Sequence, residues 1–110
     1  MDKISLIIPC YNEEDSLPYL YEELKKVSEN MATQNFEFIF VNDGSKDKTL
    51  QTLRELSLKD ERVNYLSFSR NFGKEAAIYA GLKKASGDYI ALMDADLQDP
   101  PSLLEEMYQA

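Results

Sequence analysis

The sequence of 110 residues contains no histidine and a single cysteine, Cys10. One cysteine cannot form an intrachain disulfide, and it cannot supply a zinc cluster. The commonest general base of enzymes and the commonest ligand of transition metals are also absent, because both are histidine. Serine–histidine–aspartate catalysis is therefore excluded.

Targeting segments and several nucleotide-binding motifs are also missing. No apolar run approaches the roughly 20 residues that cross a bilayer, and the N-terminus carries no signal peptide. There is no G-x-G-x-x-G motif, no P-loop motif and no G-x-S-x-G nucleophile elbow. We therefore expect a soluble chain, suited to a reducing cytoplasm, that is neither a NAD- or FAD-dependent enzyme nor a P-loop NTPase.

Acidic residues outnumber basic residues by 20 to 12, which gives a formal net charge of −8. Such a surface repels phosphate backbones, so nucleic acid is excluded as the expected partner. A nucleotide remains compatible, because a bound cation can reverse the sign of the local field. The hydrophobic fraction of 44% supports a packed core, and the length predicts one domain, residues 1–110.

Short apolar runs alternate with helical patterns along the whole chain. The runs predict buried strands, at residues 4–8, 36–41, 63–68 and 89–93. The helical patterns begin at an N-cap, Ser16, with Pro18 in the first turn, then near Asp47, at Lys74 and near Pro100. The third helix is expected to end at Ser86-Gly87, and Gly81 allows it to pack closely on the sheet.

Strands separated by helices of roughly ten to fifteen residues predict an α/β, Rossmann-like fold with a mainly parallel sheet and helices on both faces. Right-handed crossovers in a doubly wound layout favour the strand order 3-2-1-4. This order reverses between the first and fourth strands, and ligands bind outside the carboxyl ends of the strands at such a switch point. The residues that follow each strand are therefore the candidates for a binding site.

Two carboxylates, Asp94 and Asp96, follow the fourth expected strand. Carboxylates this close repel one another unless a cation neutralises them. Hard oxygen ligands suit Mg²⁺ or Mn²⁺, which complete their shell with phosphate oxygens and water, and Gln98 offers a neutral oxygen. An exposed turn or a helix cap explains many isolated D-x-D pairs, and Asp99 before Pro100 is interpreted as such a cap.

The other strand ends carry polar groups that each allow a functional and a structural interpretation. Asp43, in an Asp-Gly-Ser turn, is either a simple turn residue or an acceptor for a base or ribose. Arg70 and Lys74 are either solvated charges or contacts for a diphosphate or base. Tyr11 stacks on a base or packs in the core, and Glu13 adds acidic charge near a helix N-terminus.

These segments together resemble the family-2 glycosyltransferases of the GT-A fold. The resemblance rests on IIPCYNEE at 7–14, VNDGSKD at 41–47 and MDADLQDP at 93–100, whose order and spacing span nearly the whole chain. The segment SRNFGKEAA at 69–77 resembles the bacterial polyprenyl-phosphate (bactoprenol) glycosyltransferases. Dolichyl-phosphate mannose synthases are relatives that usually carry a different loop there.

The resemblance implies a nucleotide-sugar site with assigned roles. Pro9, Tyr11 and Glu13 would line the nucleoside pocket, Asp43 would accept from the base, and Lys74 would contact the base or the phosphates.

The resemblance also implies the reaction and its metal. Asp94 would lie near the ribose or the metal, and Asp96 with Gln98 would hold Mg²⁺ or Mn²⁺ on the diphosphate. Asp94 and Asp96 are thus the catalytic candidates of an inverting transferase that moves a hexose, glucose, from a UDP-sugar to polyprenyl phosphate. The alternatives are a family-2 enzyme with a sugar or polysaccharide acceptor, and a nucleotide-binding fragment that is inactive as it stands.

Members of this family have a second half that shapes the acceptor site, and membrane helices often follow it. We therefore expect a truncated nucleotide-sugar-binding half-domain, whose parent works at the cytoplasmic face of a membrane. Apolar residues of the last helix and an unpaired fourth strand then predict self-association into a homo-oligomer.

Overall fold

A four-stranded parallel sheet runs through the molecule in the order β3-β2-β1-β4. The computed structural model describes residues 2–31, 35–93 and 95. Both the parallel pairing and the strand order confirm the sequence prediction. The strands are β1 (Lys3–Cys10), β2 (Asn35–Asn42), β3 (Val63–Ser67) and β4 (Tyr89–Leu92), and the helices are α1 (Leu17–Asn30), α2 (Thr49–Lys59) and α3 (Lys74–Lys84).

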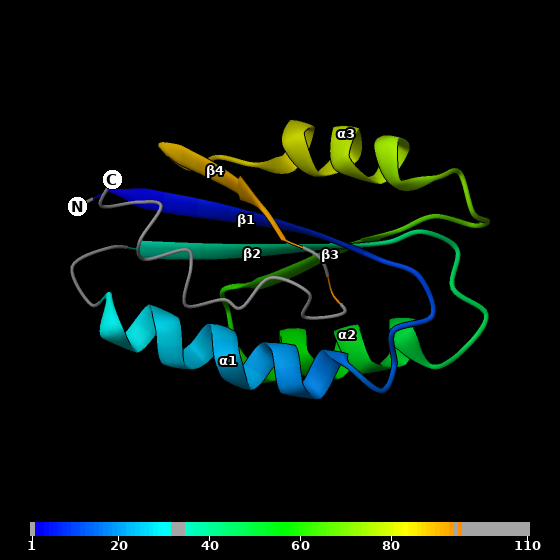
Figure 1. The fold of residues 1–110 in the computed structure, drawn as a ribbon, viewed down its shortest axis with the longest axis horizontal. Helices are drawn as coiled ribbons and strands as arrows, with labels where there is room; N and C mark the ends of the chain where they lie inside the picture. The colour runs from blue at the N-terminus through cyan, green and yellow to red at the C-terminus, as the bar shows by residue number, and fades with distance from the viewer. Residues whose placement is uncertain (1, 32–34, 94, 96–110) are drawn as a thin grey trace.

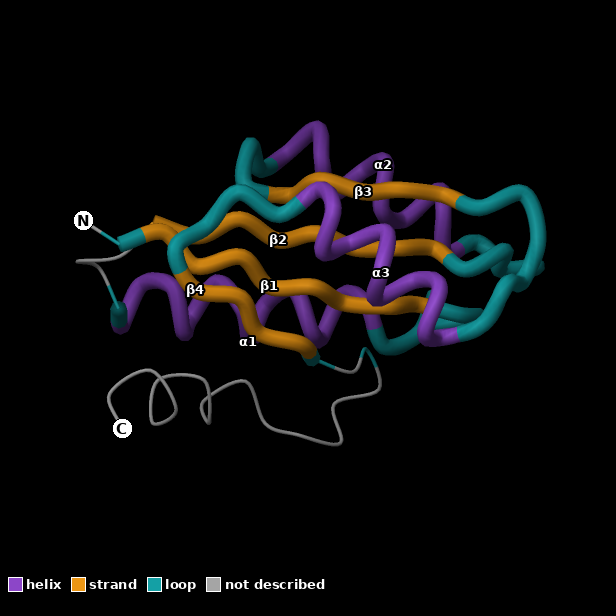
Figure 2. The backbone as a smooth tube through the Cα atoms, turned by 90° about the horizontal axis from the view of Figure 1, so that it is seen from above, coloured by secondary structure: helices purple, strands orange, loops and turns teal. Residues whose placement is uncertain are grey.

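The helices cover both faces of the sheet, with α1 and α2 on one side and α3 on the other (Figure 1). Seen from above, the four strands lie side by side with α3 across them (Figure 2). Successive strand residues point to opposite faces, so Ile4, Leu6 and Ile8 of β1 lie together in the core under α1 and α2. Burial on both faces explains why β1 and β2 read as continuous apolar runs.

The start of α1 differs in detail from a simple capped helix. Ser16 is the N-cap residue and Pro18 lies in the first turn, as predicted, but the Ser16 side chain makes no capping bond. Its hydroxyl instead donates to the Glu13 carboxylate over 2.6 Å. The Ser16 side chain therefore fixes the preceding loop rather than the helix.

Two glycines explain how closely α3 and the following turn approach the sheet. A Cβ at Gly81 would lie 2.4 Å from Cγ2 of Ile7, which confirms the predicted close packing. The helix ends at Lys84, and Ala85 turns the chain into an extended conformation. The prediction that Gly87 ends the helix as a left-handed glycine cap is wrong, because Gly87 is not one of the glycines with a positive φ. A Cβ at Gly87 would instead lie 2.8 Å from the carbonyl oxygen of Lys3, so the close approach to β1 requires glycine.

Other boundaries differ by one or two residues from the prediction, with α2 beginning at Thr49 rather than near Asp47. The helix predicted near Pro100 lies outside the described residues. Among the helices that the structure describes, none combines the length and the apolar character needed to span a membrane.

Candidate functional site

Three loops meet at the carboxyl end of the sheet, at the right of Figure 1. They follow β1, β2 and β3 and comprise residues 11–16, 43–48 and 68–73, here called the first, second and third loops. The neighbours β1 and β4 form the point where the strand order reverses, which is where ligands bind in open α/β sheets.

The first loop is bound to the second through Asn12. The Asn12 N–H donates to the Ser45 hydroxyl over 2.9 Å, and the Asn12 side-chain oxygen accepts from the Lys46 N–H over 2.8 Å. Asn12 has a φ of 54°, in the left-handed region that asparagine tolerates better than most residues. The Glu13 N–H donates to the Thr49 hydroxyl over 2.9 Å. Asn12 therefore joins the first loop to the second, and the Glu13 N–H joins the first loop to the first residue of α2.

Asp47 joins the same two loops and the start of α2. Its carboxylate accepts from the N–H groups of Thr49 over 2.9 Å and Glu14 over 3.3 Å. Burial alone would raise the pKa of Asp47, but these hydrogen bonds and one from the Thr49 hydroxyl outweigh it and hold the pKa below its usual value. An anionic Asp47 at a helix N-terminus also interacts favourably with the helix dipole.

Asp43 holds the third loop. Its side chain is buried, and one carboxylate oxygen accepts from the Phe72 N–H over 2.7 Å. The other oxygen accepts from the Gly73 N–H over 3.0 Å and from the Asn71 amide over 3.1 Å. Three N–H donors compensate the burial of the carboxylate. Asp43 is therefore not a simple turn residue, which was one of the two interpretations of its sequence context, because its carboxylate binds the third loop.

Gly44 brings the second and third loops into direct backbone contact. A Cβ at this position would lie 2.1 Å from the carbonyl carbon of Arg70 and 2.3 Å from the nitrogen of Asn71. Its φ of +69° also lies in the region that favours glycine. Both the conformation and the space therefore require glycine here.

The third loop carries an aromatic and cationic cluster. The Phe72 ring contacts Phe68 edge to face, with centroids 5.6 Å apart. The Arg70 guanidinium carbon lies 4.9 Å from the centroid of the Phe72 ring, in cation–π distance. Arg70 and Phe72 are both exposed.

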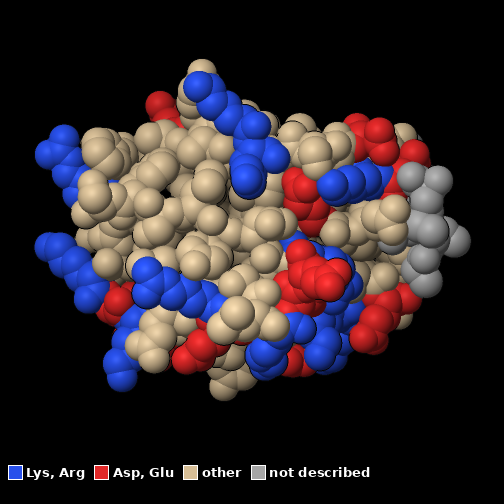
Figure 3. All heavy atoms as spheres, turned by 180° about the vertical axis from the view of Figure 1, so that it is seen from behind, with Lys and Arg blue, Asp and Glu red and all other residues tan. Residues whose placement is uncertain are grey.

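Basic side chains gather at this end of the molecule despite the acidic total. Lys46 and Lys48 of the second loop are exposed, as are Arg70 and the first residue of α3, Lys74. Viewed from behind, lysine and arginine side chains project from the same end, at the left of Figure 3. These four cations offer charge partners for an anionic ligand, and the same loops also carry the acidic residues Glu13, Glu14, Asp15, Asp43 and Asp47.

The predicted nucleoside residues lie on this rim with different exposure. Pro9 and Glu13 are half-buried. Tyr11 is 42% exposed, so its side chain does not pack in the core. Asp43 is buried behind the third loop, and Lys74 begins α3. The structure thus brings the predicted positions to one end of the sheet.

The predicted metal ligands Asp94, Asp96 and Gln98 lie outside the described residues. Their neighbours Met93 and Ala95 are buried in the core under α1, and the Met93 N–H donates to the Ile7 carbonyl over 3.0 Å. Among residues 2–31, 35–93 and 95, no group of three side chains suited to holding a metal ion is present. The oxygen donors of Asp94, Asp96 and Gln98 are chemically suited to Mg²⁺ or Mn²⁺.

Sequence reasoning assigns no role to Asn12, Asn71, Asp47 or Thr49, which hold the loops together. All four lie in or beside the short polar loops that follow β1, β2 and β3. A side-chain amide can both donate and accept, so asparagine in such a loop is the signal that indicates cross-loop bonding.

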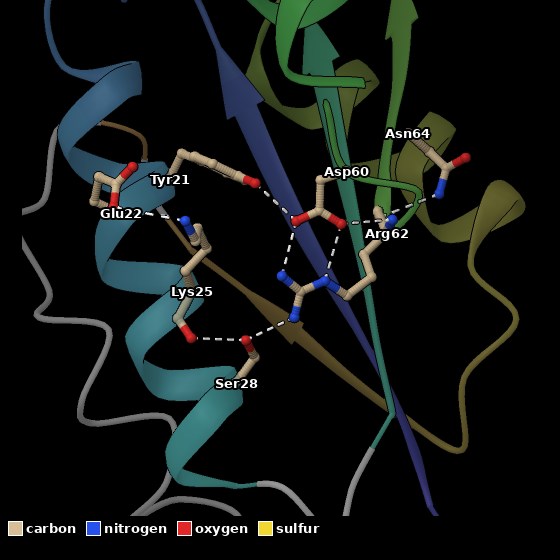
Figure 4. Close-up of polar contacts among 7 residues, drawn as sticks. All are labelled: Tyr21, Glu22, Lys25, Ser28, Asp60, Arg62 and Asn64. Atoms are coloured by element: carbon tan, nitrogen blue, oxygen red, sulfur yellow. Dashed lines mark hydrogen bonds and ion pairs between the residues drawn. The ribbon is translucent and has the colours of Figure 1, made fainter. Parts of the chain in front are cut away.

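At the opposite end of the sheet, polar side chains form hydrogen bonds that hold helices and turns together. Arg62 donates to both oxygens of Asp60, over 3.0 and 2.8 Å, and to the Ser28 hydroxyl over 2.7 Å (Figure 4). The Tyr21 hydroxyl donates to Asp60 over 2.8 Å. The hydrogen bonds from Arg62 hold the pKa of the Asp60 carboxyl at about 2. These four residues, the Asp60–Arg62 network, connect α1 to the turn before β3.

A second carboxylate at this end, Glu37 of β2, fixes the turn before β4. It accepts from the Ser86 hydroxyl over 2.8 Å and the Ser86 N–H over 3.2 Å, and it pairs with the Lys3 ammonium at 3.0 Å. Burial would raise the pKa of Glu37, but these bonds outweigh it and lower the pKa. Glu37 and Asp43 are thus comparable carboxylates at opposite ends of one strand.

The sequence matches one protein family over nearly its whole length. The model of the family described as "Glycosyl transferase family 2" matches residues 5–110. A Bacillus subtilis protein, "Uncharacterized glycosyltransferase YkcC", is 50% identical over 105 residues, which cover 96% of this chain and 32% of that protein. The Escherichia coli "Prophage bactoprenol glucosyl transferase homolog" is 45% identical over 108 residues, covering 94% of this chain and 35% of that protein.

Solved structures share the fold. The crystal structure of S. aureus TarS 1-349 in complex with UDP has a TM-score of 0.76 and 27% identity, over 97% of this chain and 31% of that chain. The chain therefore spans about a third of the length of these three proteins.

Proposed function

Because this chain belongs to glycosyl transferase family 2, we propose that its three carboxyl-end loops bind the nucleoside-diphosphate sugar of a glycosyltransferase. The observation that carries the proposal is that these loops are joined to one another at the carboxyl end of the sheet, with the first loop beside the switch point between β1 and β4. UDP is the nucleotide in the complex of the similar TarS structure, and a UDP-sugar is accordingly the proposed donor.

For the whole protein we propose transfer of a hexose, glucose, to polyprenyl phosphate with inversion. Support comes from the bactoprenol glucosyl transferases, which are 45% identical over 108 residues. The acceptor is a membrane lipid and nucleotide sugars are made in the cytoplasm, so the proposed place of reaction is the cytoplasmic face of the membrane. The acceptor site would lie in the part of the fold beyond this nucleotide-binding part, residues 1–110.

The roles proposed for the donor site follow the positions of the side chains. The exposed ring of Tyr11 is available for stacking on the base, with Pro9 and Glu13 beside it in the same segment. Lys74, at the start of α3, is proposed as a contact for the base or the phosphates. Asp43 is proposed to accept from the base.

We propose that Asp96 and Gln98, with Asp94, bind Mg²⁺ or Mn²⁺ beside the diphosphate. When bound there, the cation acts as a Lewis acid that stabilises the charge developing on the departing diphosphate. Asp94 and Asp96 would act by holding that cation and orienting the donor. A phosphate acceptor is already ionised at pH 7, so the reaction does not depend on a general base to deprotonate it.

UDP binding is expected to require Mg²⁺ or Mn²⁺, because close carboxylates and a diphosphate repel one another without a cation. The expected loss on adding EDTA is on the order of tenfold or more in affinity, equivalent to about 1.4 kcal/mol for each tenfold. Isothermal titration calorimetry with and without EDTA measures it, and Asp96→Asn should reproduce the loss. Equal affinities in both buffers would exclude the metal role, and no binding in either would contradict the proposed donor site.

Self-association is also proposed, from the apolar side chains near β4. Tyr89, Ile90 and Leu92 of β4 are each about half exposed, as is Leu82 of α3. Within the described residues β4 pairs only with β1, and an unpaired strand edge invites pairing with another chain. Light scattering at micromolar concentration should detect a dimer or larger species, and Ile90→Lys should reduce it. A monomer with cooperative unfolding would show that the prediction is wrong.

A further inference from the structure

We propose that Thr49 and Asp47 are positioning residues, which hold the backbone of the first loop in the shape that the nucleoside contacts of Tyr11 and Glu13 require. The inference rests on the proposed function and leaves the proposed contact of Asp43 with the base unchanged. It adds two residues that act on the nucleotide through the first loop.

Three successive backbone N–H groups of the first loop, those of residues 12–14, donate to side chains 33 to 36 residues further along the chain. The acceptors are, in order, the Ser45 hydroxyl, the Thr49 hydroxyl and the Asp47 carboxylate. Successive N–H groups in a loop can form a concave site for a phosphate, but these groups already have acceptors inside the protein. The first loop therefore offers a ligand its side chains and not these backbone donors.

The Thr49 hydroxyl connects the first loop to Asp47. It donates its proton to one Asp47 carboxylate oxygen, and it accepts from the Glu13 N–H over 2.9 Å. The other Asp47 oxygen accepts from the Glu14 N–H over 3.3 Å. Asp47 thus fixes the direction of the Thr49 hydroxyl, which must turn its lone pairs toward Glu13. Since Thr49 is fully buried, it can act on a ligand only through the backbone that it holds.

The backbone held in this way carries the side chains proposed for the nucleoside. Tyr11 directly precedes the first of the three bonded N–H groups, and Glu13 provides the second. The Glu13 carbonyl accepts from the N–H groups of Ser16 and Leu17 over 3.2 and 3.0 Å, and the Glu13 carboxylate accepts from the Ser16 hydroxyl over 2.6 Å. Ordering a loop during binding costs affinity, so a loop that is already ordered binds its ligand more tightly.

The first measurement needs no ligand. Thr49→Val replaces the hydroxyl with a methyl group of similar size, whereas Thr49→Ser keeps a hydroxyl. Amide hydrogen exchange should show the Glu13 N–H protected in the wild type and in Thr49→Ser, and at least about tenfold less protected in Thr49→Val. Asp47→Asn, which replaces an acceptor oxygen with a donor, should expose the Glu14 N–H in the same way. It provides a second test if Thr49→Val does not fold. Unchanged protection in the variants that fold would overturn the proposal.

Asp60→Asn is the matched control, at the other end of α2. Like Asp47, Asp60 is half-buried, and its carboxylate accepts from Arg62 and from the Tyr21 hydroxyl. The control should lower the free energy of unfolding but change UDP affinity by less than about twofold. It separates a general loss of stability from a loss of loop shape.

The second measurement is UDP affinity, by calorimetry with Mg²⁺ present, under conditions where every variant is folded. Thr49→Val should weaken UDP by on the order of tenfold, and Thr49→Ser should restore affinity to within about twofold of the wild type. Tyr11→Ala should also weaken UDP. The double variant Tyr11→Ala, Thr49→Val should be little weaker than either single variant, because Thr49 acts through the segment that carries Tyr11.

The outcomes distinguish this inference from the proposed function. A wild type that binds UDP as well as Thr49→Val does would overturn the positioning role and leave the donor site standing. Losses that multiply in the double variant would show that Thr49 does not act through Tyr11, and a Thr49→Ser variant as weak as Thr49→Val would show that the hydroxyl is not the cause. A wild type that does not bind UDP would refute the proposed function and the inference with it.

Discussion

Replacing Gly44 with alanine is expected to lower the free energy of unfolding by about 3 kcal/mol and to weaken UDP binding. Left-handed backbone costs an alanine about 1 kcal/mol or more, and overpacking adds about 1–3 kcal/mol. The new Cβ would lie 2.1 Å from the Arg70 carbonyl carbon, a backbone atom that can move only with the third loop. Urea unfolding followed by circular dichroism measures the stability.

Gly73→Ala is a comparison variant for this prediction. Gly73 also has a positive φ, +102°, but a Cβ there would meet nothing within 4 Å. Its ψ of 158° places it in a region that essentially only glycine adopts, so the substitution should cost about 1–3 kcal/mol from backbone conformation alone. A loss of no more than about 1 kcal/mol for Gly44→Ala, the left-handed penalty alone, would show that the contact between the second and third loops contributes nothing to stability.

Arg62→Ala is expected to lower the free energy of unfolding by about 2 kcal/mol. The substitution removes two hydrogen bonds to Asp60 and one to Ser28, and bonds to a charged group contribute about 1.5–3 kcal/mol. It also removes the guanidinium 5.3 Å from the centroid of Phe38. Lys26→Ala, which breaks only an exposed ion pair with Glu23, should change the stability by less than about 0.5 kcal/mol.

The effect of Arg62→Ala should depend on pH in a predictable direction. The folded pKa of Asp60, about 2, lies below its ordinary value of 3.8. A lowered carboxyl pKa stabilises the fold fully above the unfolded pKa, and this stability is lost as the pH falls through the folded value. The gap between wild type and variant should therefore be constant near about pH 6 and narrow between about pH 4 and about pH 2. A gap that does not narrow on acidification would mean that Asp60 is not the partner responsible.

The fold could be predicted from the sequence because local and long-range signals agree. The runs at β1 and β2 are too short for buried helices and too apolar for a half-exposed sheet, so they indicate parallel strands. The contacts at the ends of helices could not be predicted where a residue common in helix caps has a different partner. Ser16 occupies an N-cap position yet bonds to Glu13, and Gly87 follows a helix yet serves a contact with Lys3.

The site could be predicted only in part. Motif positions indicate which strand ends carry ligand-type groups, and the structure brings Tyr11, Glu13, Asp43 and Lys74 to the same end. The partners of those groups depend on contacts between loops that are far apart in sequence, such as Asp43 with Phe72. No local pattern shows that a turn aspartate is buried, so its bonding could not be foreseen.

The strand order also has a consequence for how the chain reaches its native state. β1 is central and pairs with β2 through a crossover of ordinary length, but its pairing with β4 joins Ile4 to Tyr89. Closing the long loop between such distant residues costs conformational entropy before the contact contributes any stability. Contacts of this kind therefore slow folding. We therefore expect β4 to dock late, onto a layer of β1, β2 and β3 that already exists. During synthesis on the ribosome, the proposed nucleotide-binding end of the sheet would then be completed only after β4 has emerged.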